Sequence, residues 1–149
     1  MTRHLLFAGT ILVFLASSAC QSYTSGLQHG ATRVDETVAI ATLRSINTAQ
    51  KTYSLSNGGS YGTFEELVQG GYLDTRFNSS KPVFKDYVLT IAVTPKPDGA
   101  TEGSYHCNAD PQASGNRLGR HFYIDSTSAE IHFNETQPAT AADQALQPQ

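Results

Sequence analysis

The chain has 149 residues, of which 10 are Lys or Arg and 13 are Asp or Glu, giving a net charge of −3 and a charged fraction of 15%. This length suits a single domain, and the charged fraction lies well below the roughly 25% of typical soluble domains. Such an acidic chain does not offer the basic surface that contacts phosphates, so the composition argues against a nucleic-acid partner.

The first twenty residues have the layout of a secretory signal. Residues 1–4 form a short basic segment, residues 5–16 form an apolar segment, and residues 17–19 have small side chains. The apolar run is shorter than the roughly 20 residues that a membrane-spanning helix needs. We therefore predict a signal peptide over residues 1–19 and an exported protein.

Cys20 follows this segment directly. The letters LASSAC at residues 15–20 resemble the lipobox of bacterial lipoproteins, although Ser17 stands where leucine is usual. The resemblance implies that Cys20 becomes the N-terminus and carries fatty acids such as palmitate. It also implies a lipid anchor in a membrane of the bacterial cell envelope, with the protein facing the periplasm or the exterior. The alternative is an ordinary cleaved signal peptide, because Ser17 and Ala19 also satisfy the small-x-small rule.

The second cysteine, Cys107, is predicted to be a small buried side chain. If Cys20 carries lipid, Cys107 is the remaining thiol of the mature chain, and if Cys20 is free, a Cys20–Cys107 disulfide is conceivable. A nucleophilic role for Cys107 is disfavoured, because the adjacent His106 points to the opposite face of an extended strand.

The mature chain begins with a polar stretch and continues with one long helix. Residues 20–33 are polar, contain two glycines and predict a flexible tether. From about residue 35 to residue 56 the apolar side chains recur at helical spacing, and Gly58 and Gly59 then favour a helix end. The predicted buried face comprises Ala39, Leu43, Ile46, Gln50 and Tyr53.

A short second helix is predicted after Thr63. Thr63 and Glu66 have the spacing of a capping box, in which each side chain accepts a hydrogen bond from the other residue's backbone N–H. The helix then extends to about Gln69 and ends at Gly70 and Gly71.

The remaining residues predict β-structure followed by a disordered tail. Residues 87–94 alternate between apolar and other side chains, and residues 104–108 form a second predicted strand. Residues 121–125 and 130–133 predict a terminal hairpin. Residues 135–149 show no apolar period, so we expect them to be disordered.

The order of these elements predicts an α+β fold over residues 34–134. The expected architecture is a long N-terminal amphipathic helix packed on a small antiparallel sheet of three to four strands. With the helix letters LRSINTAQ at residues 43–50 and GRHF at residues 119–122, this order resembles the head domain of type IV pilins and type II secretion pseudopilins. The chain departs from those families because it lacks their long apolar helical stem.

The sequence offers weak candidates for a metal site. His106, His121 and His132 lie on predicted strands, and Asp110 and Asp125 flank a loop that the pseudopilin resemblance would make a calcium site. Their spacing matches no zinc motif, and calcium usually takes several carboxylates among six to eight oxygen ligands.

The sequence thus predicts a non-catalytic protein that needs no cofactor. It is expected to be a lipid-anchored lipoprotein of the periplasm or cell surface that acts through protein–protein contacts, accessory to a type II secretion or type IV pilus system. The alternative is a small periplasmic metal- or ligand-binding protein that uses the histidines and the loop after Asp110.

Overall fold

The computed structural model of the protein describes residues 32–112 and 119–147. The chain divides into two units, residues 1–34 and residues 35–149, and the sheet and its surroundings belong to the second unit. The predicted signal peptide, Cys20 and nearly all of the predicted tether lie outside the described residues.

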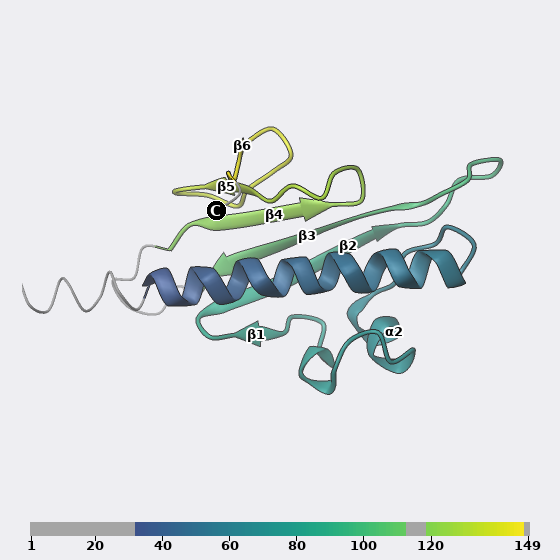
Figure 1. Cartoon of the computed structure of the whole chain (residues 1–149), viewed down its shortest axis with the longest axis horizontal. Coiled ribbons are helices and arrows are strands. Elements are labelled where there is room, and N and C mark those ends of the chain that lie inside the picture. Colours follow the sequence, from purple (N-terminus) through teal and green to yellow (C-terminus); the bar gives the residue numbers. More distant parts are fainter. Residues whose placement is uncertain (1–31, 113–118, 148–149) are drawn as a thin grey trace, which may run out of the picture. The chain divides into compact units, whose positions relative to one another are not determined.

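A single long helix occupies residues 32–56 (Figure 1). It begins before the expected start at residue 35, so Thr32 and Arg33, at the end of the predicted tether, are helical. The helix ends where Gly58 and Gly59 take positive φ angles of 59° and 85°, a conformation that glycine adopts without steric cost.

The predicted capping box is confirmed at helix α2, Phe64–Gln69. The backbone N–H of Thr63 donates to Glu66 Oε2 at 2.7 Å, and the N–H of Glu66 donates to Thr63 Oγ1 at 3.3 Å. A short 3₁₀ helix, η1, follows at Thr75–Phe77 and leads into the sheet.

The sheet has six strands, and each strand is antiparallel to its neighbour in the order β1-β2-β3-β4-β5-β6 (Figure 1). Because the order follows the sequence, the sheet is a continuous meander whose two edges are β1 and β6. The strands are β1 Val83–Phe84, β2 Tyr87–Thr94, β3 Ser104–Pro111, β4 His121–Asp125, β5 His132–Asn134 and β6 Gln144–Ala145.

The predicted fold class, a long helix on a sheet of three to four strands, is therefore wrong. The sheet is larger because it gains β1 and β6, two-residue strands at its two edges. Two residues are too few to show the alternating pattern of a strand, and each of these strands is defined by backbone pairing with its neighbour.

The prediction of a disordered tail over residues 135–149 is also wrong for the described part. Residues 135–147 fold back after β5, and β6 pairs with it through His132 opposite Ala145 and Phe133 opposite Gln144. The tail lacks an apolar period because it is held by backbone and polar side-chain contacts, which hydrophobic patterning does not report.

One face of the long helix and one face of the sheet share the hydrophobic core. Ala39, Leu43 and Ile46 of the helix are fully buried and belong to the same cluster as the inward side chains of the sheet. The buried sheet members of the cluster include Tyr87, Leu89, Tyr105, Cys107, Ala109, Phe122 and Ile124.

Candidate functional site

The register of β3, β4 and β5 divides their side chains between two faces. Cys107 lies opposite Ile124, and both are fully buried in the core. Neighbouring positions point the other way, so Asn108, Tyr123 and His132, which are paired across the three strands, share the opposite side of the sheet. We call this side the outer face, and all the predicted metal-site candidates lie on it.

Cys107 is placed as a structural residue. The side chain is fully buried, and burial raises the pKa of its thiol well above the ordinary value. A thiol that stays protonated is a poor nucleophile and a poor metal ligand. His106 lies on the outer face, so the structure does not combine these two residues into a catalytic pair.

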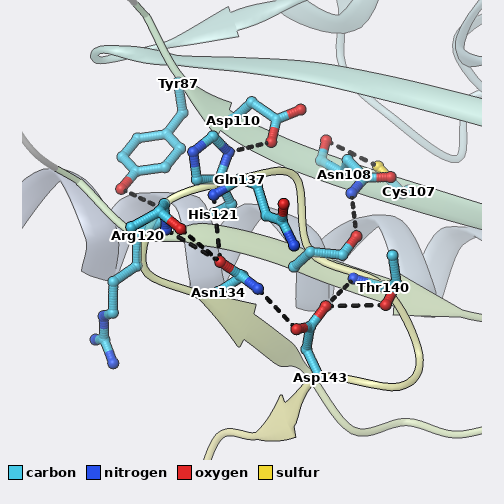
Figure 2. A network of polar contacts seen from close by, with 12 residues as sticks. Tyr87, Cys107, Asn108, Asp110, Arg120, His121, Asn134, Gln137, Thr140 and Asp143 are labelled. Carbon is cyan, nitrogen blue, oxygen red and sulfur yellow. Dashed lines mark hydrogen bonds and ion pairs between the residues drawn. The ribbon is translucent and has the colours of Figure 1, made fainter.

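A hydrogen bond joins Asp110 and His121 across β3 and β4. His121 Nδ1 lies 2.6 Å from Asp110 Oδ1, and both side chains are partly shielded from solvent (Figure 2). A carboxylate accepts, so His121 Nδ1 carries the proton in this contact. The pair ties the two strands together at the end of the sheet where β3 reaches Pro111.

Three aromatic rings lie side by side further along the outer face. The ring of Tyr123 stacks on His106 with a centroid distance of 5.8 Å and meets His132 edge-on at 6.3 Å. Tyr123 thus separates the two histidines, and burial together with the hydrogen bond to Asp125 raises the pKa of Tyr123 to about 12.

Asp125 is committed to the turn that leaves β4. Its Oδ1 accepts the backbone N–H groups of Thr127 at 2.9 Å and Ser128 at 3.1 Å, and its Oδ2 accepts the Tyr123 hydroxyl at 3.1 Å. Burial alone would raise the pKa of this carboxyl, but the donors outweigh it and hold the pKa below its usual value.

The structure does not bring the metal candidates together. His121 pairs with Asp110, Asp125 caps its own turn, and Tyr123 lies between His106 and His132. Within residues 32–112 and 119–147, no group of three or more His, Cys, Asp or Glu side chains is placed to hold a metal ion.

The GRHF letters at residues 119–122 have structural roles. A Cβ atom at Gly119 would lie 2.5 Å from the Tyr87 hydroxyl, which donates to the Arg120 carbonyl at 2.9 Å (Figure 2). The Arg120 guanidinium donates to Glu36 Oε2 at 2.8 Å and lies over the ring of Phe133. These contacts join the long helix to β4 and β5.

The LRSINTAQ letters at residues 43–50 also serve the framework. Gln50 is fully buried and bonds both backbone groups of Gly62, at 2.5 Å to the carbonyl and 2.9 Å from the N–H. Asn47 Oδ1 accepts the Tyr105 hydroxyl at 2.8 Å. The motifs behind the family resemblance therefore position the core.

A polar network on the outer face belongs to the C-terminal strap, which we define as residues 135–147. The Asn108 side chain donates to the Ala139 carbonyl at 2.8 Å, so the strap crosses the outer face above β3 (Figure 2). Ala139 is buried there, at 2% exposure.

Asp143 is the centre of this network. Its Oδ1 accepts from Asn134 Nδ2 at 2.7 Å, and its Oδ2 accepts the N–H and the hydroxyl of Thr140 at 2.8 and 2.9 Å (Figure 2). The Asn134 bond, followed by those from Thr140, lowers the pKa of the Asp143 carboxyl. His132 Nδ1 lies 2.8 Å from the Asp143 carbonyl, so that nitrogen donates.

Sequence reasoning missed the strap and its network. The usable signal is the spacing of Thr140 and Asp143, because a Thr and an Asp three residues apart can close a turn by local side-chain bonds. The role of Asn134 needs the fold, since its partner Asp143 is brought back only when β6 pairs with β5.

Comparison with protein-family models, curated proteins and solved structures finds no match for this chain. Among the residues that the structure describes, no helix is long and apolar enough to cross a membrane.

Proposed function

We propose that the protein is a non-catalytic, lipid-anchored lipoprotein of the bacterial cell envelope that acts through protein–protein contacts. The anchor rests on the lipobox-like residues 15–20, with Cys20 as the lipid-modified residue. Acylation at more than one position would hold the protein firmly, because each buried methylene contributes about 0.8 kcal/mol and one chain alone is marginal.

The proposal of a non-catalytic protein rests on one observation: the potentially reactive side chains make contacts that hold the fold together. Cys107 is enclosed in the core, His121 is paired with Asp110, and Asp125 is saturated by donors from its own turn. Because these side chains hold the fold together, we infer that the domain acts by presenting a fixed surface to a partner.

The resemblance of residues 43–50 and 119–122 to pilin and pseudopilin heads supports a partner in a type II secretion or type IV pilus system. The resemblance stays a proposal, because these residues position the core and do not mark a partner surface. The alternative, a small metal- or ligand-binding protein, is favoured only by the three rings of His106, Tyr123 and His132 on the outer face.

The first test is membrane fractionation of cells that express the full chain or its Cys20→Ser variant. We expect the wild type in the membrane fraction with the mass of a lipidated Cys20, and the variant in the soluble fraction. A variant that stays in the membrane fraction, or an unmodified Cys20 at the mature N-terminus, would contradict the proposal.

Metal analysis of the purified mature protein separates the two candidate functions. We expect no stoichiometric metal after purification without chelators. A metal that remains bound at one ion per chain would favour the alternative.

A further inference from the structure

The C-terminal strap contributes little apolar burial to the protein it covers. Ala139 is its buried side chain, and Leu146 is partly buried against the core. The other described strap side chains are exposed or half-buried. A segment attached in this way can open at a small fraction of the free energy that unfolding of the core requires.

The surface beneath the strap presents side-chain hydrogen-bond donors to it, and Asn134 Oδ1 also accepts from the strap N–H groups of Thr136 and Gln137. Asn108 Nδ2 and His132 Nδ1 donate to the strap carbonyls of Ala139 and Asp143, and Asn134 Nδ2 donates to the Asp143 carboxylate. The outer edge of β5 adds the backbone groups that β6 now pairs. If the strap leaves, these groups are complementary to an extended backbone that carries a carboxylate.

We propose that the strap is exchangeable, and that an extended, carboxylate-bearing segment of a partner protein displaces residues 135–147 and pairs with β5 in their place. This inference rests on the proposed function, because it takes the partner to be a protein. The strap itself shows which chemistry the site accepts, since Asp143 supplies both the carboxylate and a carbonyl.

The opposite edge of the sheet is less suited to the same role. β1 has two residues, and Lys81, Pro82 and Lys85 flank it. Lysine and proline beside a short edge strand hinder pairing with another chain. We therefore assign partner pairing to β5.

The strap also regulates access to this site. A covalently linked segment competes at an effective concentration that reaches the millimolar range for short linkers. A partner segment must therefore bind more strongly than the strap or arrive where the strap is already weakened. In the resting protein the site is closed.

Hydrogen exchange measures whether the strap opens independently. The soluble Cys20→Ser chain is compared with the same chain carrying Asp143→Asn, and Asp98→Asn on the exposed β2–β3 turn is the matched control. We expect amides of residues 139–147 to exchange at least tenfold faster in the Asp143→Asn chain, while β3 amides and the Asp98→Asn chain are unchanged. Equal acceleration in β3, or no acceleration in the strap, would overturn the proposal.

Displacement of the strap by another segment is tested with a labelled synthetic peptide that has the sequence of residues 135–147. We expect fluorescence anisotropy to show at least tenfold tighter binding to the Asp143→Asn chain than to the chain with an intact strap, because its own strap competes less. A peptide in which Asp143 is replaced by Asn should lose this binding.

Equal or absent binding of the intact peptide to both chains would refute the exchange of the strap. This outcome is distinguishable from failure of the proposed function, because the Cys20→Ser fractionation does not depend on the strap. Both chains in the peptide experiment lack the anchor, so membrane attachment does not affect the result.

Discussion

Gln50 joins the long helix to the loop before α2 through both atoms of its side-chain amide. Its Nε2 donates to the Gly62 carbonyl and its Oε1 accepts from the Gly62 N–H, and the side chain is fully buried. A side-chain amide carries both an acceptor and a donor, so it can satisfy a buried N–H and a buried carbonyl at the same time. Gln50 was predicted on the buried helix face, but the helical period does not predict its partner Gly62.

Replacing Gln50 with Met keeps the volume but removes both hydrogen bonds. We expect Gln50→Met to lower the free energy of unfolding by about 1–3 kcal/mol, because both backbone groups of Gly62 stay buried without partners. Urea denaturation measures this change. Gln69→Met is the matched control on an exposed position and should change stability by less than about 0.5 kcal/mol. Similar losses in both variants would show that the Gly62 contacts contribute nothing specific.

Asp125 makes stability dependent on pH at the acid end. The pKa of its carboxyl is lowered in the folded protein by the Thr127, Ser128 and Tyr123 donors, despite the opposing effect of burial. A group with a lowered folded pKa stabilises the fold above its unfolded pKa of about 3.9, and this contribution disappears as the pH falls through the folded value. The turn after β4 should therefore weaken below about pH 4.

We expect the Asp125→Asn chain to be less stable than the wild type at neutral pH and to lose less stability between about pH 4 and pH 2. Thermal unfolding followed by circular dichroism across this range measures the difference. Glu130→Gln, an exposed acid-to-amide change on the same turn, is the control and should follow the wild-type curve. An Asp125→Asn curve parallel to the wild type would contradict the assigned role.

The long helix buries Ala39, Leu43, Ile46 and Gln50 as its sequence period predicts, whereas Tyr53, predicted on the same face, is half-buried. Leu43 is fully buried in the core cluster, whereas Lys51, two turns further along, is exposed. The helical period was readable from the apolar side chains of the buried face, but it does not report the polar side chains Thr42, Asn47 and Ser54, which are buried as well. The Thr63–Glu66 capping box was predictable because its hydrogen bonds join residues only three positions apart.

The two faces predict opposite responses to truncation. Leu43→Ala should lower the free energy of unfolding by about 2–5 kcal/mol, because it removes buried methyl groups and leaves a cavity. Lys51→Ala should change it by less than about 0.5 kcal/mol. Melting temperatures of the two variants measure the contrast, and equal shifts would mean that the helix presents a different face to the sheet.

The two edge strands could not be predicted in this way. Val83 and Phe84 form β1 only because β2 offers backbone partners at Val88 and Tyr87. Gln144 and Ala145 form β6 in a polar tail whose return depends on Asp143. Their positions depend on contacts between distant segments, which single-residue preferences do not encode. The strap network was missed for the same reason.

At the scale of the whole molecule, the sheet ends in strands that offer little edge for pairing. β1 and β6 have two residues each, and Val83 on β1 is about half exposed, at 49%. Lys81 and Lys85 flank β1, so two sheets brought together at this edge would place like charges side by side. The pattern protects an otherwise apolar edge from self-association.

We therefore expect the mature chain with Cys20→Ser to be a monomer by light scattering and to form no filaments in electron micrographs. Replacing Lys81 with Thr and Lys85 with Asn removes the edge charges, and Asn tolerates the positive φ of 54° that residue 85 adopts, so this variant should show a larger, concentration-dependent mass. Lys51→Thr together with Arg44→Thr, exposed on the long helix, is the control and should stay monomeric. Filaments of the unaltered soluble chain would show that assembly proceeds through a surface other than the protected edge, and that the protein polymerises without an apolar stem.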